Sequence, residues 1–300
     1  MSEQLRLERI RTFTHGNAAY STAVSPNGKQ LATASLDNTV RLWDLSNGEM
    51  VGTLKGHGDG VCFVGYLSDG RIVTGSLDRT LRVWSADGSS VLTTFTGHQD
   101  YLTCAAVARS GTLLASAGFD KTVRLWDAQT ELAAAVFTGH TENIQCVAIN
   151  SDGKTIASGG DDQSIRLWSI DSQSLLKVVM GHSKGVEGLA FSPDGKMLAS
   201  ASGDGSVRLW SNTGEPIATL EQISGLVKSV LFSPDGRWLV SGDGVGMLRV
   251  WDVTTLQIVQ AISGHKNSIH GLAFSPDGHQ FASAGFDRTI HVWQVIGAKS

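Results

Sequence analysis

Apolar and polar residues alternate, or form short apolar runs, along nearly the whole chain. The segments "KMLASAS" at 196–202 and "SVRLW" at 206–210 are typical, and turn-forming residues such as "SPDG" at 192–195 separate them. Alternation with a period of two is the pattern of a half-buried β-strand, and a short apolar run fits a fully buried strand. The pattern therefore predicts many short strands joined by tight turns.

These segments return at a fixed interval. The string "ASLDNTVRLW" at 34–43 is repeated as "ASGDGSVRLW" at 201–210. Seven tryptophans close successive copies at spacings of 41 or 42 residues, namely Trp43, Trp84, Trp126, Trp168, Trp210, Trp251 and Trp293, and only Trp238 falls outside this series. About four strands fit each period, and sheets of that size bury their faces when copies stack radially.

Three further features recur in register with these tryptophans. A "GH" pair precedes the first strand of most copies, an Asp stands in a tight turn, and "W" or "WD" closes the third strand. On these features the chain resembles the WD40 repeat family over nearly all of residues 6–295. The resemblance implies an all-β fold, a seven-bladed β-propeller of four-stranded antiparallel blades. We expect residues 1–300 to form this single domain.

Four side chains recur together in six copies: a His in the first turn, a Ser or Thr ten residues before the Trp, an Asp six residues before it, and the Trp. The sets are His15, Thr33, Asp37 and Trp43; His57, Thr74, Asp78 and Trp84; His98, Ser116, Asp120 and Trp126; His140, Ser158, Asp162 and Trp168; His182, Ser200, Asp204 and Trp210; and His265, Ser283, Asp287 and Trp293. The resemblance implies a hydrogen-bonded network in each set, from Asp through His and the hydroxyl to the indole. The chemistry agrees, because a buried indole N–H needs an acceptor and a carboxylate fixes the imidazole tautomer.

Ser, His and Asp are also the residues of a hydrolytic triad, but catalysis needs one nucleophile and this set is repeated at the period of the scaffold. The sixth copy favours the structural interpretation. It keeps Ser241 and Trp251, whereas Val245 replaces the Asp and Ile223 replaces the His. Because the Asp and the His are lost together, neither is left buried without a hydrogen-bond partner, so the change is nearly neutral for the stability of the blade. We therefore expect no catalytic residue.

The last copy is one strand short. It has room for three strands, and residues 6–14, "RLERIRTFT", precede His15 as "VLTTFTG" precedes His98. An unpaired sheet edge favours aggregation. We expect residues 6–14 to form the outer strand of the seventh blade and to close the ring.

If repeated residues build the scaffold, binding residues should lie among those that vary between copies. In related propellers the residues three and five after the His and one before the Asp face the top opening. At these positions, copies seven, one, two and three carry mostly apolar side chains, and copies four to six carry polar or small ones. The candidate partner-binding residues are Tyr20, Leu36, Leu77, Tyr101, Phe119, Asp161, Glu187, Lys228, His270 and Phe286. Aromatic anchors beside charges are typical of protein-binding faces, and packing of each apolar side chain on its own turn is the alternative.

Composition and charge argue against nucleic-acid binding and membrane insertion. The net charge of −4 gives no attraction for phosphate backbones or acidic lipids, and no apolar run is long enough to span a bilayer. An Arg stands two residues before the Trp in copies one to six, and its even spread indicates packing or salt bridges between blades rather than one basic groove. The odd set of Cys62, Cys104 and Cys146 contains no C-x-x-C pair. We expect a cytoplasmic chain with reduced thiols, without nucleic acid or membrane insertion.

Two functions remain open. The expected one is a non-catalytic scaffold that docks protein or peptide partners mainly on the top face, as a monomeric propeller within a complex. The alternative is a small-ligand binder or enzyme at the mouth of the central channel, which needs titratable groups that converge there. Asp161, Glu187 and His270 are the candidates for that role. His270, His279 and His291 show no metal-ligand spacing, so neither a metal site nor a cofactor is expected.

Overall fold

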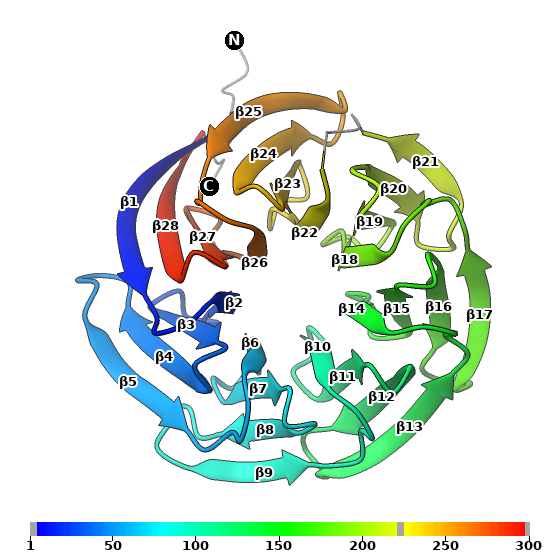
Figure 1. Cartoon of the computed structure of the whole chain (residues 1–300), viewed down its shortest axis with the longest axis horizontal. Coiled ribbons are helices and arrows are strands. Elements are labelled where there is room, and N and C mark those ends of the chain that lie inside the picture. The colour runs from blue at the N-terminus through cyan, green and yellow to red at the C-terminus, as the bar shows by residue number, and fades with distance from the viewer. Residues whose placement is uncertain (1–4, 221–224, 298–300) are drawn as a thin grey trace.

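The short strands predicted from the alternating pattern are present. The computed structural model describes residues 5–220 and 225–297. Within these residues, 28 strands form seven four-stranded antiparallel sheets. The sheets stand as blades around a central opening, so the predicted seven-bladed propeller is confirmed (Figure 1). No helix in this part of the chain is long and apolar enough to cross a membrane.

The blades follow one another in chain order. Blades one to four contain β2 (Ala19–Val24), β3 (Gln30–Ser35), β4 (Thr39–Asp44) and β5 (Met50–Lys55); β6 (Val61–Tyr66), β7 (Ile72–Ser76), β8 (Leu81–Trp84) and β9 (Val91–Phe95); β10 (Leu102–Val107), β11 (Leu113–Gly118), β12 (Thr122–Asp127) and β13 (Leu132–Thr138); and β14 (Ile144–Ile149), β15 (Thr155–Gly160), β16 (Ile165–Ser169) and β17 (Ser174–Val179). Blades five to seven contain β18 (Val186–Phe191), β19 (Met197–Ser202), β20 (Val207–Ser211) and β21 (Pro216–Thr219); β22 (Val227–Phe232), β23 (Trp238–Asp243), β24 (Met247–Asp252) and β25 (Gln257–Ser263); and β26 (Ile269–Phe274), β27 (Gln280–Gly285), β28 (Thr289–Ile296) and β1 (Arg6–Thr14).

The core lies between neighbouring blades. The second strand of each blade is rich in Ala, Ser and Gly and is almost fully buried, since small side chains let adjacent sheets approach closely. Each repeat Trp packs toward the preceding blade. Trp43 stacks on Phe13 with ring centroids 4.3 Å apart, and Trp168 lies 5.6 Å from Phe137. Every blade is therefore stabilised by the next one along the chain.

The N-terminal strand closes the ring, as predicted. β1 pairs antiparallel with β28 from Arg6 opposite Ile296 to Thr14 opposite Thr289, and the two lie side by side in Figure 1. The side chain of Gln260 in blade six accepts a hydrogen bond from Leu7 N at 2.8 Å. Because Phe13 of β1 also stacks on Trp43 of blade one, β1 contacts blades six, seven and one.

The first strand of every blade carries a β-bulge near its start. The register shifts fall at the residue five after each network His or, in blade six, at the equivalent position. A bulge redirects a side chain out of the regular pleat. The seven bulge residues are Tyr20, Cys62, Thr103, Gln145, Glu187, Lys228 and His270, and all of them line the central channel.

Candidate partner-binding site at the channel mouth

Six polar networks hold the turns on one face of the ring, called the top face here. In each network the His Nδ1 lies 2.8–3.3 Å from the Asp carboxylate, and the His Nε2 lies 2.7–2.8 Å from the Ser or Thr hydroxyl. The indole N–H donates to the same hydroxyl over 2.8–3.0 Å. The Asp also accepts the backbone N–H that follows the His, as from Gly58 at 2.9 Å. The structure thus brings together all four members of every complete set.

Burial favours a neutral imidazole in four of these networks, because it lowers the pKa of His15, His140, His182 and His265. Burial lowers the pKa of His140, although the Asp162 carboxylate works in the opposite direction. Burial acts to raise the pKa of the Asp120 carboxyl, but the hydrogen bonds from His98, the Gln99 backbone N–H and Thr122 lower it to about 2. A neutral imidazole then donates from Nδ1 to the carboxylate and accepts the Ser or Thr proton at Nε2. Such a chain fixes the geometry of the turn, and its Ser or Thr is fully buried with the hydroxyl against the indole.

Blade six replaces the network with a different polar contact. Ser241 still accepts the indole N–H of Trp251 at 3.0 Å, Val245 is exposed, and Ile223 lies outside the described residues. Asp243, at a position where other blades have Ser or Gly, is buried and forms an ion pair with Arg249 at 2.7 Å. This ion pair lies within one blade, as does the pair of Arg41 with Asp37 in blade one. Arg41 also contacts the neighbouring blade, as expected, because its guanidinium donates to Thr14 O of β1 at 2.6 Å.

The bulge residues form the wall of a hollow of about 250 Å³ at the channel. Several of them also bond to the neighbouring blade: Thr103 Oγ1 donates to Ile144 O at 2.7 Å, and Cys62 Sγ donates to Leu102 O at 3.0 Å. Four sequence candidates, Tyr20, Glu187, Lys228 and His270, lie on this wall. The channel mouth and the outer top face are therefore lined by different candidates.

An aromatic group lies where the ring closes. The His270 ring stacks on Phe286 with centroids 4.4 Å apart, and Tyr20 lies 4.6 Å from His270. The Ser268 hydroxyl is 3.0 Å from His270 Nε2. Burial, helped by the charge of Lys228, lowers the pKa of His270 to about 3, so this ring is a neutral aromatic surface at physiological pH.

Further apolar side chains lie on the top face of blades one to three. Leu36 and Leu77 approach each other over Gly60, where an added Cβ would lie 2.7 Å from Leu36 Cδ2 and 3.4 Å from Leu77 Cδ1. Leu77 and Tyr101 line one shallow pocket, and the Tyr101 ring is 5.9 Å from that of Phe119. We call the whole set the apolar arc; it comprises Tyr20, Leu36, Leu77, Tyr101, Phe119, His270 and Phe286.

The opposite side of the mouth is polar. Lys228 Nζ and Glu187 Oε2 form an ion pair at 2.8 Å, with both side chains mostly buried. Asp161 is exposed and accepts hydrogen bonds from Gln145 Nε2 at 3.1 and 3.2 Å. Asp161 forms no ion pair with any residue in the described ranges, so its charge faces solvent. The two acidic candidates are therefore not equivalent.

Two of the three cysteines, Cys62 and Cys146, are buried, and Cys104 is partly buried. Cys62, Cys104 and Cys146 form no disulfide, and burial raises the pKa of each, to about 12 for Cys104. Protonated thiols are weak nucleophiles and poor metal ligands.

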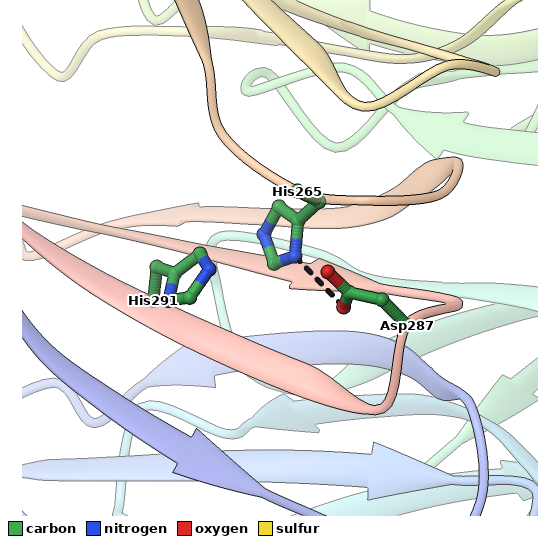
Figure 2. A group of neighbouring side chains, drawn as sticks. All are labelled: His265, Asp287 and His291. Carbon is green, nitrogen blue, oxygen red and sulfur yellow. Dashed lines mark hydrogen bonds and ion pairs between the residues drawn. The ribbon is translucent and has the colours of Figure 1, made fainter.

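Two features of the structure were not predicted. The first is a set of exposed cations, Arg79, Lys121 and Arg288, which follow the network Asp in blades two, three and seven and have positive φ. The other feature is His291, which lies with its ring 4.4 Å from that of His265 (Figure 2). A signal was available for it, because His291 stands two residues before Trp293, where copies one to six have Arg.

Comparison with known proteins agrees with this architecture. The model of the family described as WD domain, G-beta repeat (WD40), matches seven times, at residues 7–44, 48–85, 89–127, 133–169, 173–211, 214–252 and 256–294.

Similarity to individual curated proteins extends over about one repeat. A stretch of 43 residues, 14% of this chain, is 49% identical to Denticleless protein homolog of Danio rerio and spans 7% of that protein. A stretch of 45 residues, 15% of this chain, is 51% identical to Eukaryotic translation initiation factor 3 subunit I of Neosartorya fischeri and spans 13% of it. Another of 45 residues is 40% identical to Periodic tryptophan protein 2 of Saccharomyces cerevisiae and spans 5% of it. The seven matched repeats and the ring of seven blades show that this chain belongs to the WD40 repeat family, whose members generally serve as scaffolds for protein interactions.

Proposed function

We propose that this chain is a non-catalytic scaffold that docks a protein or peptide on its top face, with the apolar arc as the anchor. The observation that carries the proposal is that these side chains meet on four consecutive blades: Phe286 with Tyr20, Leu36 with Leu77 over Gly60, and Tyr101 with Phe119. Tyr101 in this arc is 46% exposed. Clustered aromatic and branched side chains on a rigid backbone supply most of the energy of protein–protein contacts.

The charges beside the arc favour a particular partner. Lys228 already neutralises Glu187, whereas Asp161 faces solvent across the mouth. We propose that the partner inserts an aromatic or branched apolar side chain into the arc and places a Lys or Arg at Asp161. A charge-assisted hydrogen bond of this kind fixes orientation more than it adds affinity.

The titration of the channel groups supports binding over catalysis. The lowered pKa of His270, to about 3, leaves no proton for it to donate at neutral pH. The raised pKa values of Cys62, Cys104 and Cys146 leave the thiols without nucleophilic thiolate. A general acid or base works best with a pKa near the operating pH. The alternative of an enzyme at the channel mouth is therefore the weaker proposal.

The remaining assignments are proposals of the same kind. The chain acts as a single propeller domain that joins complexes as a monomer, and the free cysteines favour the cytoplasm. The net charge of −4 disfavours nucleic acid as the partner.

The test is a pull-down from native cell extract with wild type and the Tyr101→Ala, Phe119→Asp double variant, with mass spectrometry of retained proteins. A partner that wild type retains is then purified and its dissociation constant measured for each variant. We expect the double variant to weaken binding by at least tenfold, because it removes two anchor rings and places a charge on the arc.

A matched control addresses the sides of the propeller. Val136→Asp and Leu176→Asp change exposed apolar residues of the outer strands β13 and β17, which are 49% and 57% exposed. These variants should bind as wild type does. If they lose the partner while the double variant keeps it, docking occurs on the side of the ring and the top-face proposal is wrong.

A further inference from the structure

A cluster of side chains in blade seven lies apart from the apolar arc. His265, Asp287 and His291 point toward one another, and one nitrogen or oxygen atom from each lies within 4.8 Å of the others (Figure 2). His265 precedes β26, Asp287 lies in the turn between β27 and β28, and His291 belongs to β28. The fold thus assembles two imidazoles and one carboxylate at the blade that closes the ring.

The composition of this cluster distinguishes blade seven from the other six blades. Copies one to six have Arg at the position of His291. In blade one this is Arg41, whose guanidinium lies 3.6 Å from the network Asp37. A guanidinium is permanently charged and offers only donors, so it excludes a cation from that space. The imidazole of His291 instead offers a lone pair.

Each imidazole is held by its other nitrogen. His265 Nε2 lies 2.8 Å from Ser283 Oγ, and His291 Nδ1 lies 2.9 Å from Thr12 Oγ1 of β1. His265 Nδ1 then faces Asp287 Oδ1 at 3.1 Å, and Asp287 Oδ2 accepts the backbone N–H of Lys266 at 2.8 Å. Metal-binding histidines characteristically have such a hydrogen bond on the second ring nitrogen, which fixes the tautomer and the ring orientation.

We propose that His265 Nδ1, His291 Nε2 and the Asp287 carboxylate bind one divalent transition-metal ion of the zinc class. Tetrahedral zinc with nitrogen and oxygen ligands separates those ligand atoms by about 3.4 Å. The distance of 3.1 Å between His265 Nδ1 and Asp287 Oδ1 is close to this value, and an inward shift of His291 by at most about 1.4 Å completes the triad. The Thr289 hydroxyl, 3.0 Å from His265 Nδ1, or a water molecule is the fourth ligand.

The ligand types and the surrounding charges define the ion. Imidazole nitrogen with carboxylate suits zinc, cobalt or nickel, whereas magnesium and calcium select oxygen ligands. On binding, His265 changes to its other neutral tautomer: Nδ1 gives its proton to solvent, Nε2 takes one up from solvent, and the Nε2–H then donates to the Ser283 hydroxyl oxygen. Arg9 of β1 is the cation whose charge reaches both histidines, and its exposure to solvent weakens the repulsion. The bound ion would join three segments of the closing blade and stabilise the ring.

The test uses the untagged full chain, treated with a chelator and dialysed. Zn²⁺ is titrated in competition with a chromophoric chelator, and Co²⁺ serves as the spectroscopic probe. The variants are His291→Arg, which places the residue of copies one to six at this position, and His279→Ala, a control that removes a blade-seven histidine outside the cluster. Circular dichroism without metal establishes that each variant is folded.

We expect wild type and His279→Ala to bind one ion per chain, with Co²⁺ ligand-field bands typical of nitrogen and oxygen ligands and a rise in melting temperature on adding Zn²⁺. His291→Arg should lower the affinity at least tenfold and abolish the rise in melting temperature. The proposal is overturned if wild type binds no ion or if folded His291→Arg binds as tightly as wild type. An intense sulfur-to-cobalt charge-transfer band would also overturn it, by placing the ion on the cysteines.

Discussion

The contribution of the polar network to stability is measurable by making the same substitution in two blades. Ser116 is fully buried in blade three, and its hydroxyl lies 2.8 Å from both Trp126 Nε1 and His98 Nε2. Ser241 is equally buried in blade six, where its side chain accepts from Trp251 Nε1 at 3.0 Å. Both changes to Ala remove one oxygen from the equivalent site.

The expected loss of unfolding free energy depends on how many buried polar groups each substitution leaves without a hydrogen-bond partner. A buried polar group without a partner costs about 1–3 kcal/mol. Ser241→Ala strands the indole N–H, whereas Ser116→Ala strands the indole N–H and the imidazole nitrogen. Ser116→Ala should therefore lower the free energy of unfolding by about 1–3 kcal/mol more than Ser241→Ala does.

The assay is urea denaturation followed by tryptophan fluorescence and circular dichroism, with the midpoint and slope compared between the two variants. The slopes should agree, because the same surface is exposed on unfolding. Equal losses of stability in the two variants would refute the reasoning, since the imidazole would then contribute nothing through the hydroxyl.

Three further predictions concern the closing strand, the pH dependence and blade six. Deleting residues 1–14 removes the buried side chains of β1 and exposes the edge of β28. The melting temperature should therefore fall, or the protein should aggregate on heating. Unchanged thermal unfolding would contradict this prediction. Burial lowers the folded-state pKa of His270 to about 3 and of His291 to about 4. Below about pH 6.5 the unfolded chain therefore binds protons that the folded chain does not, so the urea concentration at the unfolding midpoint should fall from pH 7 to pH 5. A constant midpoint would argue against buried neutral histidines. Arg249→Met leaves the buried Asp243 carboxylate without its cation and should cost about 3 kcal/mol. Adding Asp243→Ser, the residue of blades one, two and five, should recover part of that loss, and a further loss in the double variant would show that the pair is not the source of the effect.

Much of the candidate site could be read from the repeat because equivalent positions have equivalent surroundings. Counting five residues from the His selected Tyr20, Glu187, Lys228 and His270, which line the hollow at the channel, whereas the candidates one residue before the Asp do not line it. The bulge that turns Tyr20 and His270 into the channel was not visible, because a bulge changes the register of two strands without leaving a fixed sequence signature.

The ion pairs also could not be predicted from the sequence. Glu187 and Lys228 are 41 residues apart and belong to different blades, so their contact exists only when the ring is assembled. Asp243 likewise looks like a turn residue in the sequence, and only the structure shows its ion pair with Arg249. These contacts depend on side-chain direction after packing, and the local pattern of burial does not encode that direction.

The sequence by itself determined the strands, the number of blades, the members of the polar networks and the strand that closes the ring. These properties depend on short-range periodicity and on a repeat that each blade satisfies in the same way. Only the tertiary structure decided which variable residues of separate repeats meet, as in Tyr20 beside Phe286 and the ion pair of Glu187 with Lys228. The physical reason is that curvature of the ring and contact between blades bring together side chains from separate repeats, and no repeat contains that information alone.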